Sequence, residues 1–267
     1  MSPRNKQFKD FRGEPRRAPA ERGDWIYGRR PVLEVVKSGK RHLYEAALPL
    51  EGCDAPEVAE LRGLLVKLGV PFKALEREEL DALCEGGNHQ GVAVRTGGFP
   101  YISIEQVVHD AKEDPNALVL ILDHIEDPQN VGSLLRSADA AGVTAVLLPE
   151  DRASGVTPAA VRASAGASEH MRVAKVVNLV RAMQELKECG VWITGLDFGP
   201  DAKAYTRVDF KGRVGLVVGS EGRGLSRLVR EHCDFIACLP MKGQVESLNA
   251  GVAGAIALFE IVRQRAR

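Results

Sequence analysis

Three short glycine-containing segments in the second half of the chain combine side chains that could bind or activate a polar substrate. They are residues 130–136 (NVGSLLR), 219–224 (GSEGRG) and 247–251 (SLNAG). Each stands where an apolar run, expected to form a strand, gives way to an expected helix. Such junctions leave backbone N–H groups free and expose the positive end of a helix dipole, which favours an anionic or polar ligand. Because three such junctions follow one another, we expect one composite site.

The polar residues of these segments also have simpler structural interpretations. Asn130 stands where a helix is expected to begin and could only cap it, while Arg136 could be a solvated surface residue or a bidentate phosphate ligand. Glu221, between glycines, could be a first-turn acid that the helix dipole favours. Ser247 is a good helix cap, whereas Asn249 has poor helix propensity and therefore invites a functional reason.

Apolar runs predict the sheet that would position these segments. We expect strands at residues 118–122, 145–148, 191–196, 214–218 and 235–239, separated by helices at residues 131–141, 178–188, 226–232 and 247–265. Strands without polar alternation, separated by helices, are typical of a mainly parallel sheet covered by helices on both faces. Ligands bind outside the carboxyl ends of such strands, where all three segments lie.

The first half of the chain predicts a smaller α/β domain at residues 24–96. We expect helices at residues 30–38, 57–68 and 76–84, with strands at residues 43–48, 72–75 and 91–95. The helical spacing of four leucines in 57–68, followed by Gly69, is the clearest of these patterns. Residues 97–115 form the predicted linker, which begins with a Gly-Gly-Phe-Pro turn and contains a helix at 103–112, and the second domain occupies residues 116–267.

Basic residues cluster near the N-terminus although Lys plus Arg and Asp plus Glu both number 36, which gives zero net charge. Residues 1–23 hold seven basic against three acidic side chains and predict a disordered tail, which serves solubility or nonspecific RNA contact. A second cluster, in residues 28–42, has five basic side chains and only one acidic side chain, Glu34. These basic side chains could contact RNA phosphates or form a solvated helix face. This cluster comprises Arg29, Arg30, Lys37, Lys40 and Arg41.

Composition also disfavours several classes of protein. The five cysteines form no CxxC pair, which favours free thiols in a reducing cytosol and predicts no metal site. No apolar run reaches the roughly 18 residues of a membrane span. The N-terminus lacks the apolar core of a secretory signal. We therefore expect a cytoplasmic protein with no membrane segment.

The three segments, taken in order, resemble the SpoU (TrmH-type) family of RNA ribose 2′-O-methyltransferases in the SPOUT superfamily. The resemblance rests on residues 127–142 (DPQNVGSLLRSADAAG), 216–226 (LVVGSEGRGLS) and 239–260 (LPMKGQVESLNAGVAGAIALFE). In addition, residues 27–32 (YGRRPV) and 89–92 (HQGV) resemble the small substrate-binding domain of the branch that acts on large-subunit ribosomal RNA.

This resemblance implies a catalytic α/β domain with a C-terminal trefoil knot and, in a homodimer, an interface formed by the knot and the last helix. The small residues that follow Ala250 suit such an interface, although packing against the chain's own sheet would need the same residues. The cofactor would be S-adenosylmethionine, contacted by Gly195, Gly219, Leu239, Met241 and Leu248. The acceptor ribose would lie among Asn130, Arg136, Glu221, Ser247 and Asn249.

The role of Arg136 stays open within this resemblance. The family assigns the corresponding arginine the role of base, yet a guanidinium keeps its proton far above neutral pH. An equally good hypothesis is that Arg136 grips the adjacent phosphate and stabilises the developing alkoxide.

The additional N-terminal domain favours 23S ribosomal RNA as the substrate, with a guanosine of the peptidyl-transferase region as the most favoured target. One alternative is a transfer-RNA ribose methyltransferase with the same chemistry. Another is a non-catalytic RNA-binding or ribosome-assembly protein. A nicotinamide-dependent oxidoreductase is disfavoured, because the first strand–helix junction of the second domain lacks a GxGxxG sequence.

Overall fold

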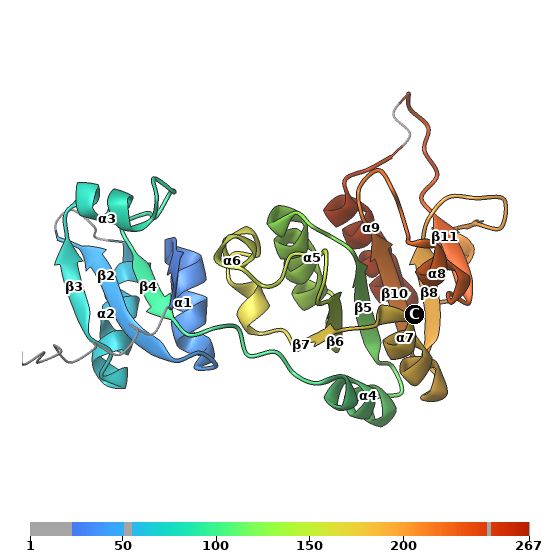
Figure 1. Ribbon diagram of the computed structural model, residues 1–267, viewed down its shortest axis with the longest axis horizontal. Coiled ribbons are helices and arrows are strands. Elements are labelled where there is room, and N and C mark those ends of the chain that lie inside the picture. The colour runs from blue at the N-terminus through green and yellow to red at the C-terminus, as the bar shows by residue number, and fades with distance from the viewer. Residues whose placement is uncertain (1–22, 51–54, 245–246, 267) are drawn as a thin grey trace, which may run out of the picture.

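The computed structural model describes residues 23–50, 55–244 and 247–266, which form two sheets, each with its own helices (Figure 1). The predicted tail, residues 1–23, lies outside the described residues except for Gly23. The predicted fold class, a mainly parallel sheet flanked by helices and preceded by a small α/β domain, is confirmed. The trefoil knot and the residue at which each domain begins and ends stay predictions.

The N-terminal domain has a four-stranded sheet in the order β1-β4-β2-β3. Its strands are β1 (Asp24–Tyr27), β2 (Leu43–Pro49), β3 (Phe72–Leu75) and β4 (Ala93–Thr96). Its helices are α1 (Arg29–Ser38), α2 (Pro56–Leu68) and α3 (Arg77–Leu83). Strands β2 and β3 run parallel, whereas β4 is antiparallel to both β1 and β2. Apolar side chains of α1 and α2, such as Val35 and Leu65, are fully buried against this sheet.

The C-terminal domain has a seven-stranded sheet in the order β7-β6-β5-β10-β8-β11-β9, and every neighbouring pair is parallel. Its strands are β5 (Leu118–Asp123), β6 (Ala145–Pro149), β7 (Val173–Val176), β8 (Trp192–Leu196), β9 (Lys203–Ala204), β10 (Val214–Gly219) and β11 (Phe235–Cys238). Its helices are α4 (Ile104–Glu113), α5 (Pro128–Ala140), α6 (Pro158–Ala163), α7 (Leu179–Glu188), α8 (Arg227–Glu231) and α9 (Ala250–Arg265), with short 3₁₀ turns η1 (Ala167–Glu169) and η2 (Tyr205–Arg207).

Strand β5 shows why the apolar runs form a sheet covered on both faces. Leu120 belongs to a buried cluster with Leu134 of α5 and Leu258 of α9, whereas Ile121 belongs to another cluster with Met183 of α7. Successive side chains of a strand point to opposite faces, so a strand covered by helices on both sides must be apolar throughout. Residues 118–122 of β5 are accordingly apolar and buried, while the sixth residue, Asp123, is buried at the end of the strand, where it accepts the Ser226 N–H.

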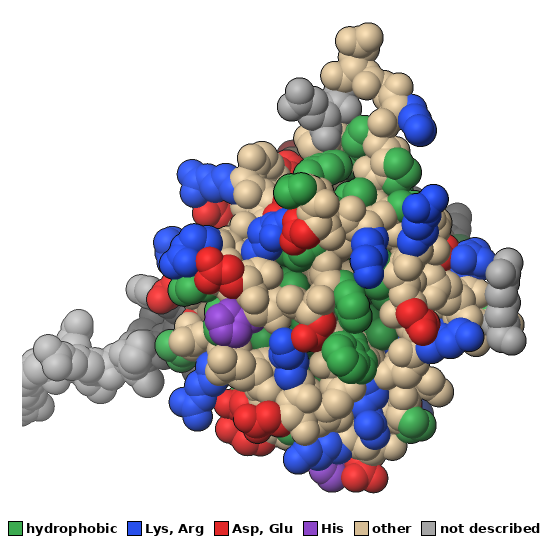
Figure 2. Space-filling model, turned by 90° about the vertical axis from the view of Figure 1, so that its right-hand side faces the viewer, with side chains coloured by type: hydrophobic (Ala, Val, Ile, Leu, Met, Phe, Trp, Pro, Cys, Tyr) green, Lys and Arg blue, Asp and Glu red, His purple; other side chains and the backbone are tan. Residues whose placement is uncertain are grey.

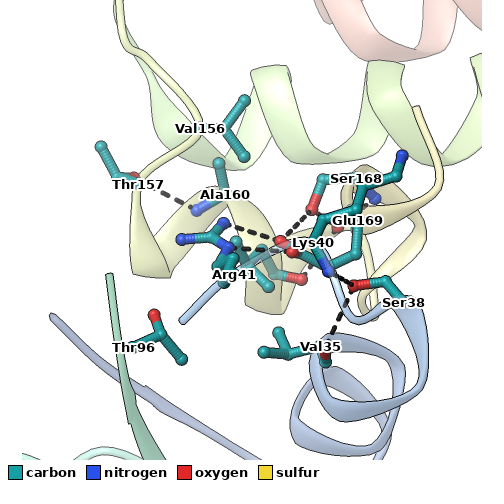
Figure 3. A network of polar contacts seen from close by, with 12 residues as sticks. Val35, Ser38, Lys40, Arg41, Thr96, Val156, Thr157, Ala160, Ser168 and Glu169 are labelled. Carbon is teal, nitrogen blue, oxygen red and sulfur yellow. Dashed lines mark hydrogen bonds and ion pairs between the residues drawn. The ribbon is translucent and has the colours of Figure 1, made fainter. Parts of the chain in front are cut away.

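The two domains are joined by buried polar contacts as well as by the chain (Figure 3). Arg41 of the N-terminal domain forms a bidentate ion pair with Glu169 of η1, with distances of 2.8 Å from Nε to Oε2 and 2.7 Å from Nη2 to Oε1. The guanidinium of Arg162 on α6 stacks over the Tyr27 ring at 4.1 Å. These contacts hold the α6–η1 segment against β1 and α1.

Two predicted helix starts are wrong, and both lie at the candidate site. Helix α5 begins at Pro128, because the Asp127 side chain accepts a hydrogen bond from the Gln129 N–H and caps it, so Asn130 lies inside the helix. Helix α9 begins at Ala250 and not at Ser247. Its cap is Asn249, whose Oδ1 accepts a hydrogen bond from the Val252 N–H at 3.2 Å.

Candidate active site

Three of the predicted site residues, one from each glycine-containing segment, form a closed network of hydrogen bonds. Glu221 Oε1 accepts bonds from Asn130 Nδ2 at 3.1 Å, from the Ala250 N–H at 3.2 Å and from Asn249 Nδ2. Asn249 Nδ2 also donates to Asn130 Oδ1 at 2.7 Å. The predicted meeting of the three segments is therefore confirmed, while the chemical roles of their residues stay predictions.

The loop after β10 brings Glu221 to the start of α9. A Cβ atom on Gly219 would collide with the backbone of Gly224, because residues 220–224 fold back on the end of the strand. Gly222 and Gly224 have φ values of 75° and 65°, which glycine adopts without strain. The turn thus places a carboxylate on the backbone N–H of Ala250, where the helix dipole stabilises a negative charge.

The other two predicted polar residues lie outside this network. Arg136 is exposed two turns along α5 and has no hydrogen bond or ion pair with any of the described residues. Ser247 is also exposed and lines the neighbouring cavity. Arg136 is therefore a cation that no described residue pairs, and Ser247 offers its hydroxyl at the cavity wall.

A cavity of about 660 Å³ lies beside the network, at the carboxyl ends of β8, β10 and β11. Four of the five predicted cofactor residues line it, namely Gly219, Leu239, Met241 and Leu248. Gly195, the fifth, is not among the lining residues, and its contact with the cofactor stays a prediction. Gly195 lies inside β8, where a Cβ atom would press against the side chains of Leu225 and Cys233.

The lining residues next to Gly195 in sequence were missed by sequence reasoning. Asp197 Oδ2 accepts a bond from Arg230 Nε at 3.1 Å, and Asp197 Oδ1 accepts one from the Phe198 N–H at 2.8 Å. Arg230 also bonds Asp201, which lowers the pKa of the Asp201 carboxyl and raises that of the guanidinium. The Phe198 side chain is 53% exposed at the cavity. Their position directly after a strand was the available signal.

The cavity therefore combines leucine and methionine walls with two carboxylates held by hydrogen bonds, Asp197 and Glu221. Its volume falls in the range of about 300–1,000 Å³ that is usual for small-molecule sites. The apolar walls suit a flat, weakly polar ring, and the Asp197 carboxylate suits a hydroxyl or a cationic group.

The predicted basic cluster does not form one face. Arg30 and Lys37 lie near acids of α2, with N–O distances of 4.0 Å to Glu57 and 2.7 Å to Glu60. The hydrogen bond to Glu60 raises the pKa of Lys37. Arg29 Nε donates to the Gln90 carbonyl oxygen at 3.0 Å.

The last two members of the cluster point to the domain junction (Figure 3). Lys40 Nζ is 3.4 Å from the Met171 carbonyl oxygen. The Arg41 side chain is only 1% exposed and is paired with Glu169. The expectation that Arg41 contacts phosphate is wrong, because its donors are turned into the protein.

The surface at the end of the C-terminal domain carries mixed charge. Figure 2 shows Lys and Arg side chains over this face together with acidic ones and with apolar side chains between them. On this face, RNA would therefore meet local groups and not one large positive surface.

The described part of the chain holds neither a group of metal ligands nor a membrane-spanning helix. Within residues 23–50, 55–244 and 247–266, no group of three or more His, Cys, Asp or Glu side chains could hold a metal ion. Four cysteines there are free thiols, and Cys53 lies outside the described residues. None of the described helices has the length and apolar character needed to cross a membrane.

Comparison with known proteins gives matches over both domains. The model of the SpoU rRNA Methylase family matches residues 117–259, and a model described as RNA 2′-O ribose methyltransferase substrate binding matches residues 25–101. The 23S rRNA (guanosine-2′-O-)-methyltransferase RlmB of Xanthomonas campestris pv. campestris is 39% identical over 249 residues, covering 92% of this chain and 98% of RlmB. An uncharacterized tRNA/rRNA methyltransferase of Mycobacterium ulcerans is 39% identical over 266 residues, covering 98% of this chain and 84% of its own length.

A solved structure shares the whole arrangement. The crystal structure of the SpoU methyltransferase AviRb from Streptomyces viridochromogenes, in complex with the cofactor AdoMet, superimposes with a TM-score of 0.76 at 25% identity. The match covers 91% of each chain.

Proposed function

Because the chain belongs to the SpoU rRNA methylase family, we propose that it transfers a methyl group from S-adenosylmethionine to a guanosine ribose 2′-hydroxyl of 23S ribosomal RNA. The observation that carries this proposal is the Asn130–Glu221–Asn249 network beside the apolar cavity. The relative RlmB supports the substrate, since its name specifies 23S rRNA and guanosine and its length matches almost completely.

The cavity residues fit the proposed cofactor. Leu196, Leu239, Met241 and Leu248 provide apolar walls for an adenine ring, while Asp197 provides a carboxylate for a hydroxyl or cationic group. The collision that a side chain on Gly219 would make shows that the main chain itself closes this part of the wall. When bound, S-adenosylmethionine supplies a methyl group on a sulfonium, which is already activated for transfer.

The protein must then position the acceptor ribose and help its hydroxyl lose a proton. We propose that Asn130 and Asn249 orient the ribose, and that Glu221 fixes both amides by accepting from each Nδ2. Ser247 would add a hydroxyl contact at the cavity wall. Arg136 is exposed, and its guanidinium stays protonated, so it suits a phosphate and a developing alkoxide better than the role of base.

We also propose that the enzyme is a homodimer whose interface includes α9. Gly254 lies on the face of α9 that packs on α5, where a side chain would strike Leu134. Val252, Ile256 and Phe259 are 48%, 37% and 50% exposed, and their i, i+4, i+7 spacing places them on one stripe. A helix that is apolar on both faces is usually buried on both, and a second copy of the chain would cover this stripe.

The N-terminal domain would select the RNA. Its presence supports ribosomal RNA over transfer RNA as the substrate. Of its basic residues, Arg29, Arg30, Lys37 and Lys40 stay candidates for phosphate contact. The name of the Mycobacterium ulcerans relative covers both tRNA and rRNA, so transfer RNA is the alternative substrate. A cytoplasmic location is part of the same proposal, because the substrate and the free thiols both suit that compartment.

A comparison of Asn249→Ala with wild type tests this function. We expect the variant to bind S-adenosylmethionine normally in calorimetry, because the Asn249 amide faces Asn130 and Glu221, but to lose most methyl transfer to rRNA. Asn116→Ala, in the exposed turn before β5, is the matched control and should behave as wild type. Full methyl transfer by Asn249→Ala would contradict the assigned site.

A further inference from the structure

A second cavity, of about 700 Å³, lies in the N-terminal domain and takes no part in the site described above. It opens at the carboxyl ends of β2 and β3, the two parallel strands of that sheet, and is lined by Pro49, Leu75, Arg29, Arg77 and the loop after α3. Ligands of α/β proteins bind at this end of parallel strands.

The loop after α3 has an unusual backbone conformation. Glu85, Gly86, Gln90 and Gly91 all have left-handed φ values, of 53°, 74°, 52° and 86°. Two of them are not glycine, and such conformations persist where the surrounding structure determines them, often at ligand sites.

The buried side chain of His89 forms hydrogen bonds that connect this loop to α3. Its side chain is buried, its Nδ1 accepts the Gly91 N–H at 3.0 Å, and its Nε2 lies 3.1 Å from Asp81 Oδ1. Because Nδ1 accepts a bond, Nε2 must carry the proton and donate to Asp81. The imidazole thus links the end of the loop to α3.

Polar groups on this loop and at the start of α3 remain available to a ligand. Asn88 is exposed, and its amide has no hydrogen bond to any residue in the described ranges. The Gln90 side chain accepts the Arg29 N–H at 3.0 Å through Oε1, which leaves its NH₂ group without a described partner. The Arg77 side chain is 84% exposed, and its contact with Asp81 is long, at 3.9 Å.

The two acids among the described lining residues are already engaged by the protein. Glu76 belongs to the capping box of α3, in which its side chain accepts a backbone N–H. Asp81 is bound to His89. Among the described lining residues, the groups available to a ligand are therefore two side-chain amides and the Arg77 guanidinium, a combination that suits a base edge and a phosphate.

We propose that this cavity binds an unpaired nucleotide of the RNA substrate, with the Asn88 and Gln90 amides on the base edge and Arg77 on the phosphate. Proteins read single-stranded RNA by hydrogen bonds to the exposed edges of its bases, and arginine pairs with phosphate. The proposal rests on the proposed function, because it takes RNA as the ligand. The loop after α3 and the start of α9 lie along the same edge of the molecule, at the top of Figure 1, so one RNA could reach both.

Fluorescence anisotropy with a labelled 23S rRNA fragment tests the cavity in the full-length protein. Asn88→Ala and Arg77→Ala should each weaken RNA binding by on the order of tenfold, as expected for loss of a base-edge or phosphate contact. The control is Lys67→Ala, which removes an exposed cation of α2 away from the cavity. Asn88→Ala and Arg77→Ala should keep wild-type affinity for S-adenosylmethionine and wild-type kcat at saturating RNA, but their KM for RNA should be raised.

Salt dependence separates the two proposed contacts. Arg77→Ala should make the negative slope of log affinity against log salt less steep by about one, because one phosphate contact is lost. Asn88→Ala should leave this slope unchanged. RNA affinities equal to that of Lys67→Ala in both variants would overturn the proposal. If both variants lose RNA affinity while the wild type transfers no methyl group, the cavity is supported and the proposed function fails instead.

Discussion

Replacement of Glu221 shows whether this carboxylate positions other groups or reacts itself. Glu221 Oε1 accepts three N–H donors, from Asn130, Asn249 and Ala250. In Glu221→Gln, the amide oxygen can accept the same bonds, but the negative charge is lost. In Glu221→Ala, all three donors lose their acceptor, and the two asparagine side chains are free to move.

The magnitudes follow from the exposure of the site. A hydrogen bond to a buried charged group contributes about 1.5–3 kcal/mol to stability. Because Glu221 is exposed, water can accept bonds from the same donors when the carboxylate is removed, so each bond contributes about 0.5–1 kcal/mol. The charge at the start of α9 adds about 0.3–1 kcal/mol. We therefore expect Glu221→Ala to lower the free energy of unfolding by about 2–4 kcal/mol and Glu221→Gln by about 1 kcal/mol.

Thermal unfolding and single-turnover methyl transfer measure the two effects separately. At about 2–4 °C per kcal/mol, Glu221→Ala should lower Tm by on the order of 5–10 °C and Glu221→Gln by about 3 °C. If Glu221 acts by positioning, release of the asparagines should slow methyl transfer about 100-fold in Glu221→Ala. Glu221→Gln should lose less than about tenfold, because its bonds are kept. Equal loss of rate in both variants, with the small Tm change in Glu221→Gln, would refute positioning and indicate that the charge itself takes part.

The remaining predictions concern other parts of the molecule. Glu169→Ala should cost about 3–5 kcal/mol in chemical denaturation, because it leaves the buried guanidinium of Arg41 unpaired; an unchanged midpoint would contradict this. Phe259→Asp should convert dimer to monomer in analytical ultracentrifugation, and a dimer that persists would exclude this face. Burial raises the pKa of the Cys233 thiol from 9.0 to about 12, so it should resist alkylation at pH 8 in the folded protein, and its contribution to stability should be lost as pH rises from 9 toward 12. Gly219→Ala should abolish S-adenosylmethionine binding in calorimetry, because a Cβ atom collides with the backbone that closes the cavity.

Much of the fold could be predicted from hydrophobic pattern because the second sheet is covered on both faces. The run 118–122 has no polar residue, and the structure makes it the buried centre of the sheet as β5. Strand β7 was missed because it is short and includes Lys175. Helix α6 was missed because it has only six residues and begins at Pro158. Neither has the length from which periodicity can be recognised.

The candidate site was predictable because its segments follow strand ends, whereas the ion pair at the domain junction was not predictable. Asn130, Glu221 and Asn249 meet because their segments follow strands of one parallel sheet. Nothing near Arg41 in sequence indicates its ion pair with Glu169, which is 128 residues away. A basic residue beside other basic residues therefore suggested phosphate contact when its role is to join two domains.

The second cavity also combines distant segments. Its loop contains His89 and Gln90, whose resemblance to a substrate-binding domain was recognisable from sequence. The cavity itself depends on Pro49, Leu75 and Arg29, which come together only when β2 and β3 pair and α1 starts beside them. Sequence patterns describe single elements well, but they do not give the space left between elements.

Transfer of a labelled methyl group from S-adenosylmethionine tests the central claim most directly. Unmodified 23S rRNA and unmodified tRNA would be offered separately, and the product digested to nucleosides. We predict 2′-O-methylguanosine from the rRNA and no label in the tRNA. Label in tRNA alone would overturn the substrate, and label in neither RNA, from protein that binds the cofactor and both RNAs, would contradict the proposed activity.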